Sequence, residues 1–251
     1  MKGAYSSSPT VAIMQPTYLP WLGYFDLIDS VDIFVILDNA QFEKQTWQQR
    51  NQLRSLAGLE WITVPVLIKG RFGQRINQVE MDRQHFVEKH LKQITQNYRS
   101  AQWYGKYYPA FSEVFRSAAE SGSLALFTVQ IIEALCIAFS LPASFVLASS
   151  LPVDGVRSEK LVNIMKALDA HIYISPKGAA EYIRTDYATF KSAGMSVFYQ
   201  NYEHPVYTQV YKPFTPYACA LDLLFNEGAE SQSIIRAGRK ELVPAEEWVT
   251  P

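Results

Sequence analysis

The sequence predicts an α/β fold of three layers, in which helices cover both faces of a mostly parallel sheet. Residues 11–14 and 33–37 are short apolar runs, which is typical of strands buried on both faces, as in a parallel sheet. Strand and helix patterns alternate again after residue 144. A hairpin pattern and, at about residues 82–141, a helical insertion separate these stretches. We expect a single domain over residues 1–251.

The first α/β unit, residues 11–38, contains a proline-rich loop at residues 15–20. Pro16 favours an extended conformation before it, and Pro20 suits the first turn of a helix because its φ is fixed and its missing N–H needs no partner there. The next helix should therefore begin near Pro20. Its free N–H groups would suit a phosphate or a carboxylate.

Ligands of open parallel sheets bind beyond the carboxyl ends of the strands. The proline-rich loop leaves the first strand at that end, and Asp38 follows the second strand. We therefore expect Gln15, Tyr18 and Asp38 to be neighbours at a crevice, and we include Trp21 among the substrate-binding residues. The alternative is that the aromatic side chains of this segment only cover the sheet.

The polar segment 39–54 predicts a loop that enters a short strand. Lys44 and Arg50 place cations close to the crevice, and Arg50 together with Asn51 would form a fork for a phosphate or a carboxylate. The alternative is a solvated basic turn, or an ion pair of Arg50 with an acidic neighbour. The position straight after a parallel strand favours binding.

A β-hairpin is predicted from residues 52–55 and 60–66, which flank a short connection containing Gly58. The glycine-punctuated loop 69–73 that follows could move over a ligand. No GxxxxGK[ST] pattern is present, so we expect no P-loop.

The helical insertion is predicted to contain three helices, the first capped by Asp82 and the others at about residues 106–119 and 123–141. His85 and His90 are five residues apart, which does not place two metal ligands on one helical face. We expect no metal site. His90 is either a hydrogen-bonded packing residue or a residue that points at the crevice.

The second α/β stretch predicts strands at residues 145–148, 171–174 and 195–199, with helices at 158–168, capped by Ser158, and at 179–183. Ser175 and Lys177 lie in a turn that leaves a strand and opens a helix, where backbone amides and a lysine can hold an anion. Residues 202–209, with Tyr207, form an aromatic loop, and residues 221–225 form a short apolar segment that contains Asp222.

Composition excludes several classes of partner. The net charge is −1, so we expect neither nucleic acid nor an anionic membrane surface as a partner. No apolar run reaches the ~20 residues that span a bilayer, and the first ten residues lack an apolar signal region, so we expect a cytoplasmic protein. Cys136 and Cys219 lie in apolar patterns, and we expect both to be reduced and unpaired.

The chain resembles the WbqC-like family of bacterial O-antigen clusters over nearly its whole length. The motifs that carry this resemblance are QPTYLPWLGYFDLI (15–28), FEKQTWQQRN (42–51), WITVPV (61–66), IYISPKGAAEYI (172–183), PVYTQ (205–209) and LDLLFNEG (221–228). The resemblance implies a role in surface-polysaccharide biosynthesis, with transfer of glycine or another acyl group onto a sugar. The chain departs from the family pattern at Asn39, Gln49 and Cys219.

The layout is also similar to that of nucleotidylyltransferases, which hold nucleotide phosphates with histidines of an HxGH-type turn. The comparable residues 19–24 read LPWLGY and contain no histidine. In a nucleotidylyltransferase reading, Lys44, Arg50, Arg157 and Lys177 would have to stabilise the phosphate oxygens.

These observations predict a transferase that decorates an activated sugar, with Asp38, His90 or Asp222 as general base. We expect a small phosphate-bearing substrate, such as a nucleotide-sugar, and neither a cofactor nor a metal. The alternatives are a nucleotidylyltransferase-like enzyme and a non-catalytic ligand-binding or scaffold protein of the same pathway. The predicted substrate-binding residues are Gln15, Tyr18, Trp21, Lys44, Arg50, Asn51, Arg157, Ser175, Lys177 and Tyr207.

Overall fold

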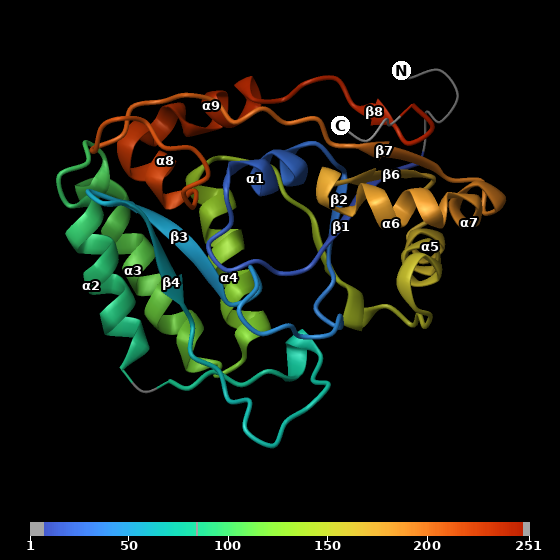
Figure 1. Ribbon diagram of the computed structural model, residues 1–251, viewed down its shortest axis with the longest axis horizontal. Coiled ribbons are helices and arrows are strands. Elements are labelled where there is room, and N and C mark those ends of the chain that lie inside the picture. The colour runs from blue at the N-terminus through green and yellow to red at the C-terminus, as the bar shows by residue number, and fades with distance from the viewer. Residues whose placement is uncertain (1–7, 84, 248–251) are drawn as a thin grey trace.

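A six-stranded sheet of strand order β5-β2-β1-β6-β7-β8 forms the centre of the protein (Figure 1). The structure, a computed structural model, describes residues 8–83 and 85–247. Neighbouring strands are parallel except β8, which is antiparallel to β7 at the edge. The strands are β1 (Thr10–Met14), β2 (Ile33–Ile36), β5 (Phe145–Leu147), β6 (Ile172–Ser175), β7 (Ser196–Tyr199) and β8 (Val243–Pro244).

The predicted parallel pair at the start of the chain is confirmed. Strands β1 and β2 are adjacent, with Val11 opposite Ile33 and Met14 opposite Ile36. The predicted strands at residues 145–148, 171–174 and 195–199 correspond to β5, β6 and β7. Strand β8 was not predicted, because a two-residue strand that contains a proline has no readable pattern.

Successive residues of β1 point into different layers, as strand geometry requires. Val11 and Ile13 belong to a core packed by α5 (Arg157–Ala167), α6 (Ala180–Thr185) and α7 (Tyr187–Ser192). Ala12 and Met14 belong to the larger core on the other face, which α1 (Leu22–Asp29) and the helical insertion cover. Figure 1 shows α5, α6 and α7 on one side of the sheet and the helices of the insertion on the other, so the three-layer prediction is confirmed.

The helical insertion consists of α2 (Phe86–Tyr98), α3 (Tyr104–Glu120) and α4 (Leu124–Ala138), which precede β5 in the chain. Two predicted helix caps are wrong. His85, not Asp82, occupies the N-cap position of α2, and Val156, not Ser158, occupies that of α5. The Ser158 hydroxyl instead donates to Oδ2 of Asp186 at 2.7 Å, which ties α5 to the segment between α6 and α7.

The predicted hairpin is present as β3 (Arg50–Ser55) and β4 (Gly58–Thr63), which pair in a separate antiparallel sheet. The Asn51 amide donates to the backbone oxygen of Tyr18 at 3.0 Å, and the Tyr18 amide donates to the backbone oxygen of Trp47 at 2.9 Å. These bonds hold the loop before the hairpin over the end of β1.

Two short helices lie between β7 and β8 in the chain, and only the first of them corresponds to a predicted segment. Helix α8 (Leu221–Glu227) covers the predicted apolar segment, whereas α9 (Ser231–Ala237) was not predicted. Single 3-10 turns complete the elements: η1 (Ile76–Gln78), η2 (Ala148–Ser150), η3 (Lys177–Ala179) and η4 (Gly228–Glu230).

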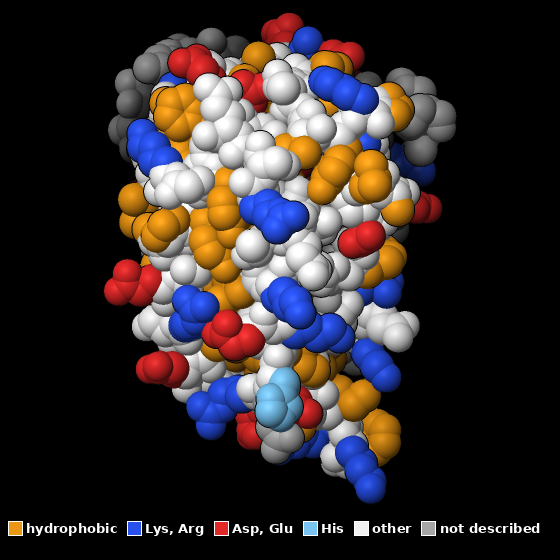
Figure 2. Space-filling view, turned by 90° about the vertical axis from the view of Figure 1, so that its left-hand side faces the viewer, with side chains coloured by type: hydrophobic (Ala, Val, Ile, Leu, Met, Phe, Trp, Pro, Cys, Tyr) orange, Lys and Arg blue, Asp and Glu red, His pale blue; other side chains and the backbone are white. Residues whose placement is uncertain are grey.

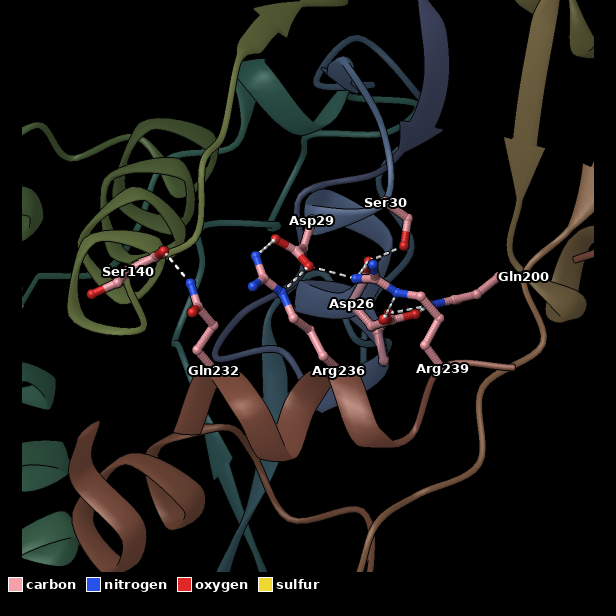
Figure 3. Close-up of polar contacts among 9 residues, drawn as sticks. Asp26, Asp29, Ser30, Ser140, Gln200, Gln232, Arg236 and Arg239 are labelled. Carbon is pink, nitrogen blue, oxygen red and sulfur yellow. Dashed lines mark hydrogen bonds and ion pairs between the residues drawn. The ribbon is translucent and has the colours of Figure 1, made fainter. Parts of the chain in front are cut away.

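Ion pairs join the end of α9 to α1 (Figure 3). Arg239 lies 2.7 Å from Oδ1 of the buried Asp26, and Arg236 lies 2.8 Å from Oδ1 of Asp29. Burial raises the pKa of Asp26, against the effect of its hydrogen bonds. Burial by itself would also raise the pKa of Asp29. Hydrogen bonds from Arg236 and Arg239 outweigh this effect, so the pKa of Asp29 is lowered.

Both cysteines are buried and unpaired, as predicted. Burial raises the pKa of the Cys136 thiol and of the Cys219 thiol to about 12, so neither is a thiolate at neutral pH. Each serves as a small apolar packing residue.

Charges of both signs are interspersed on the face over α2 and α3. Figure 2 shows basic side chains spread over the length of this face among acidic and apolar ones. This face therefore presents no extended field of one sign. None of the described helices is long and apolar enough to cross a membrane.

Candidate functional site

A cleft of about 660 Å³ opens at the carboxyl ends of β1 and β6. The chain runs from β1 to β2 and β5 on one side and then returns to β6 on the other side of β1. The loops after β1 and β6 therefore leave in opposite directions, which is where open α/β sheets bind ligands. Met14, Gln15 and Thr17 line one side of the cleft, and residues 176–179 line the other.

Aromatic and aliphatic side chains both line this cleft. Trp21, Trp47 and Tyr202 are among the aromatic ones, and Ile13 and Leu161 are among the aliphatic ones. The Trp21 and Tyr202 rings contact edge to face, with centroids 5.6 Å apart. Flat apolar walls of this kind suit the faces of a base or of a sugar ring.

Lys177 and Glu43 are the charged residues among the described lining residues. Lys177 lies in η3, directly after β6, and its Nζ donates to Oδ1 of Asn201 at 2.6 Å. Glu43 is exposed in the loop before the hairpin. A cation and a carboxylate in one apolar cleft can bind an anionic group and accept a proton, respectively.

Backbone groups fix the orientation of the amide of Gln48. Its Oε1 accepts from the backbone N–H of Glu43 at 2.9 Å, and its Nε2 donates to the backbone oxygen of Gln41 at 3.3 Å. The other Nε2 proton goes to Oε1 of Gln15 at 2.8 Å. Since Oε1 of Gln15 is the acceptor in that bond, its Nε2 is left as a donor for the cleft.

Gln200, which follows β7, has the opposite polarity. Its Nε2 lies 2.8 Å from the backbone oxygen of Gly23 and 2.8 Å from Oδ2 of Asp26, and both of these oxygens only accept. Both Nε2 protons are therefore used. Oε1 has no hydrogen-bond partner among the described residues, and because Gln200 lines the cleft this oxygen is an acceptor for a ligand.

Of the predicted substrate-binding residues, Gln15, Trp21 and Lys177 line the cleft. Lys44 and Arg157 are exposed and do not line it, and Ser175 is buried beneath it, with its hydroxyl donating to the backbone oxygen of Pro176 at 3.3 Å.

Tyr18 and His90 lie together in the core, not at the cleft. The Tyr18 hydroxyl lies 2.9 Å from Nδ1 of His90, and Nε2 of His90 lies 3.1 Å from the backbone oxygen of Thr63. Burial lowers the pKa of His90 to about 4. Both ring nitrogens are occupied by protein groups, so this arrangement is that of a neutral packing histidine.

Asp38 lies at a different cavity from Gln15, so Gln15, Tyr18 and Asp38 are not brought together. This second cavity, of about 530 Å³, is also lined by Arg75 and Asn77. The buried Asp38 carboxylate accepts from the Ser149 N–H at 2.9 Å and from the Ser149 hydroxyl at 2.6 Å. Through Ser149, Asp38 connects the end of β2 to η2, which is a structural role.

Asp222 and Tyr207 form a buried pair. The Tyr207 hydroxyl and the Gln209 amide each donate to Oδ2 of Asp222 at 2.7 Å. Burial raises the pKa of Asp222 to about 6, although these hydrogen bonds act against it. Neither residue lines the cleft.

Arg50 and Asn51 do not form the expected fork, because adjacent residues of a strand point to opposite faces. The Arg50 guanidinium lies 4.1 Å from the centroid of the Trp61 ring, whereas Asn51 reaches Tyr18. The Trp61 ring contacts Trp47, with centroids 5.4 Å apart. Arg50 thus contacts Trp61, which in turn contacts the lining residue Trp47, and Arg50 itself does not line the cleft.

Sequence reasoning missed Glu43, Trp47, Gln48, Gln200 and Tyr202 as lining residues. Gln200 and Tyr202 carried a usable signal, because they follow a predicted parallel strand just as Lys177 does. Among the described residues, no group of three or more His, Cys, Asp and Glu side chains is placed to hold a metal ion.

Comparison with known proteins supports the resemblance seen in the motifs. A family model described as "WbqC-like protein family" matches residues 15–234. The chain is 32% identical over 231 residues to a Mycobacterium tuberculosis protein named "Uncharacterized protein Rv1507c", which covers 92% of this chain and 99% of that protein. No solved structure matches the chain significantly.

Proposed function

We propose a function for this chain, which belongs to the WbqC-like protein family. In this proposal it is a transferase of surface-polysaccharide (O-antigen) biosynthesis. It binds a phosphate-bearing activated sugar between β1 and β6. The observation that carries this proposal is the cleft itself. It lies at the topological switch point and combines aromatic walls with a lysine.

Lys177 supports the binding of a phosphate. It follows β6 directly, so its ammonium group is held at the carboxyl end of the sheet. The free Nε2 donor of Gln15 lies on the opposite side of the cleft, after β1. An ammonium group and an amide donor together suit the oxygens of a diphosphate, because hydrogen bonds to charged acceptors are the stronger ones.

Gln200 supports recognition of a sugar. Only its Oε1, an acceptor, remains for a ligand, because both Nε2 protons are donated to Gly23 and Asp26. A hydroxyl or amino group of a ligand would supply the missing donor. Trp21 and Trp47 offer ring faces next to it.

Glu43 is the residue that we propose as general base, in place of Asp38, His90 and Asp222. An amino or hydroxyl group of the sugar would attack the carbonyl carbon of an activated acyl or glycyl donor. The attacking group loses its proton to Glu43, and the leaving group departs with the electron pair of the broken bond. The new bond is an amide or an ester.

The second candidate is a ligand-binding protein of the same pathway without catalysis. It is favoured by the sparse chemistry of the cleft, since the described lining residues include one carboxylate and no cysteine or histidine. A nucleotidylyltransferase-like reaction is less well supported, because Arg50 and Arg157 do not line the cleft and Lys177 would be the only described cation on the phosphates.

Calorimetric titration with uridine diphosphate and uridine-diphosphate sugars tests the binding proposal. Lys177→Ala should weaken binding at least tenfold, because it removes the charge that faces the phosphates. Lys44→Ala is the matched control, since Lys44 is an exposed lysine outside the cleft, and it should bind like the wild type. Equal affinities of both variants and the wild type would contradict a phosphate site at η3.

Product formation distinguishes the two candidates. Wild-type protein is incubated with nucleotide-sugars and activated glycine, and acylated sugar is measured by mass spectrometry. We expect product with the wild type and none with Glu43→Gln, which should retain the affinity for uridine-diphosphate sugars. Binding without any product from the wild type would favour the non-catalytic candidate.

A further inference from the structure

A smaller cavity, of about 310 Å³, adjoins the cleft. It shares Met14, Thr17, Trp21 and Trp47 with the cleft and extends from them to Tyr217. The two cavities therefore meet along the two tryptophans. Small-molecule sites have volumes of roughly 300–1,000 Å³, so the smaller cavity suits one ring and the larger one a nucleotide-sized ligand.

Exposed aromatic rings form the mouth of this smaller cavity. The Tyr217 side chain is 57% exposed and Trp47 is 53% exposed. The Trp21 and Tyr217 ring centroids are 5.5 Å apart, with the planes inclined at 59°. Large aromatic side chains left in water beside a cavity are typical of ligand-binding surfaces.

The backbone of Tyr217 is held in an uncommon conformation. Its φ is 68°, in the left-handed region that side chains other than glycine rarely adopt. The residues after it are fixed, because the Cys219 amide donates to Gln52 at 2.8 Å and the Ala220 amide donates to Pro20 at 2.8 Å. Conformations of this kind cluster at ligand-binding sites, where they place a side chain.

Thr17 supplies a polar group to the shared wall. Its hydroxyl makes no hydrogen bond within the part of the chain that the structure describes, and it lines both cavities. A hydroxyl can donate or accept, so it suits a ligand hydroxyl. Asn51 also lines the smaller cavity, with one amide proton committed to Tyr18.

We infer that the smaller cavity is a second subsite, which binds a single pyranose ring in addition to the activated sugar of the main cleft. The apolar C–H face of a pyranose packs on an aromatic ring, while its hydroxyls point outward to polar groups such as Thr17. The inference rests on the proposed transferase function, since the shared tryptophan wall would place this ring beside the activated group in the cleft.

Tyr217→Gly and Tyr217→Phe are a matched pair that tests the subsite. Glycine accepts the positive φ without strain, so Tyr217→Gly removes the ring while retaining the backbone. Tyr217→Phe retains the ring. Methyl β-glucopyranoside, methyl β-galactopyranoside and N-acetylglucosamine are titrated by saturation-transfer NMR. We expect binding of at least one of them to the wild type and to Tyr217→Phe, and an affinity at least tenfold lower for Tyr217→Gly.

Phe72→Ala is the control for loss of an exposed aromatic ring elsewhere, because Phe72 is 95% exposed and lines neither cavity. It should bind the glycosides like the wild type. Absence of glycoside binding to the wild type, or an equal loss in Phe72→Ala and Tyr217→Gly, would overturn the inference. So would an effect of Tyr217→Gly on the affinity for uridine diphosphate rather than on the affinity for the glycosides.

Titration with uridine diphosphate separates this inference from the proposed function. If uridine diphosphate binds but no glycoside does, the second subsite is wrong and the nucleotide site is retained. If glycosides bind through Tyr217 but uridine diphosphate does not, the subsite is retained and the proposed phosphate-bearing substrate is wrong.

Discussion

The Tyr18 hydroxyl lies 2.9 Å from Nδ1 of His90, inside the core that α2 shares with the loop after β1. The other ring nitrogen lies 3.1 Å from the backbone oxygen of Thr63, which can only accept. Nε2 therefore carries the proton, and Nδ1 accepts from the tyrosine. This pair joins the proline-rich loop, the hairpin and the helical insertion, so a titratable group here couples pH to the fold.

We expect acid to destabilise the protein through His90. Burial lowers its pKa to about 4 in the folded state, whereas the unfolded value is near 6.5. Below pH 6.5 the unfolded state binds more protons, so the free energy of unfolding decreases as the pH falls from 6.5 toward 4. The full effect is about 3 kcal/mol. Urea unfolding at pH 7, 6 and 5 should show a shallower pH dependence for His90→Gln than for the wild type, and parallel curves would contradict this.

Asp222 should act in the opposite direction. Burial raises its pKa to about 6, from 3.8 in the unfolded state. Between pH 6 and 3.8 the folded state binds more protons, so this group increases the free energy of unfolding as the pH falls. The two groups therefore partly cancel in the wild type. Asp222→Asn should lose stability more steeply than the wild type between pH 6.5 and 4.5, and a shallower loss would show that Asp222 is ionised in that range.

The ion pairs between α9 and α1 differ in burial, and this predicts unequal costs of removing them. Arg239→Ala leaves the buried Asp26 without its cation, which costs about 3 kcal/mol at the lower end of the range for buried pairs, because the Arg239 side chain is 34% exposed. Arg236→Ala is the control, since Asp29 retains Arg239 as a partner, and it should cost less than about 1 kcal/mol. Thermal unfolding of both variants measures the difference, and equal losses would contradict the assignment.

The sequence predicts which residues of β1 are buried, but it does not predict the order of the strands in the sheet. Val11, Ile13 and Ala12 could be assigned as buried because a doubly covered strand is apolar at every position. That β6 pairs with β1 depends on packing between residues about 160 positions apart, which no local pattern encodes. The crevice was therefore expected between β1 and β2, at Asp38, whereas the structure has its cleft between β1 and β6.

Individual cleft-lining residues could be predicted where the prediction depended only on the carboxyl end of one strand. Lys177 and Gln15 needed only the rule that sites follow the carboxyl ends of parallel strands. Arg50 and Asn51 were paired by proximity in sequence, which fails in a strand because neighbours alternate between faces. The packing role of His90 was one of the two alternatives that the sequence left open, whereas the burial of Asp222 follows from tertiary packing that no local pattern encodes.

Arg50 gives a test of the sequence-based hypothesis that its guanidinium binds a substrate phosphate or carboxylate. It stacks on Trp61, which in turn contacts Trp47 of the cleft. A contact through two rings predicts that Arg50→Lys and Arg50→Ala each weaken binding of uridine diphosphate less than threefold, against at least tenfold for Lys177→Ala. If both Arg50 variants lose as much affinity as Lys177→Ala, the guanidinium reaches the ligand directly. Calorimetric titration of the variants decides between these outcomes.

The side-chain amide of Gln200 is held in one orientation. Its Nε2 is held by Gly23 and Asp26, so its Oε1 can recognise a donor on the ligand but not an acceptor. Gln200→Met has a similar length and removes this acceptor, at the cost of the two hydrogen bonds to Gly23 and to the buried Asp26, for each of which we expect about 1–3 kcal/mol of lost stability. The affinity for uridine-diphosphate sugars should fall about tenfold, which corresponds to ~1.4 kcal/mol, because a sugar hydroxyl loses its partner.

Uridine diphosphate alone should bind Gln200→Met as it binds the wild type. It lacks the sugar attached to the diphosphate, whose hydroxyl would donate to Oε1. Gln232→Met is the control, since Gln232 is a half-buried glutamine that donates to the backbone oxygen of Ser140 and does not line the cleft (Figure 3). It should leave both affinities unchanged. An equal loss of affinity for the diphosphate and for its sugars in Gln200→Met would mean that the variant disturbs the wall formed by α1, and that Gln200 does not read the sugar.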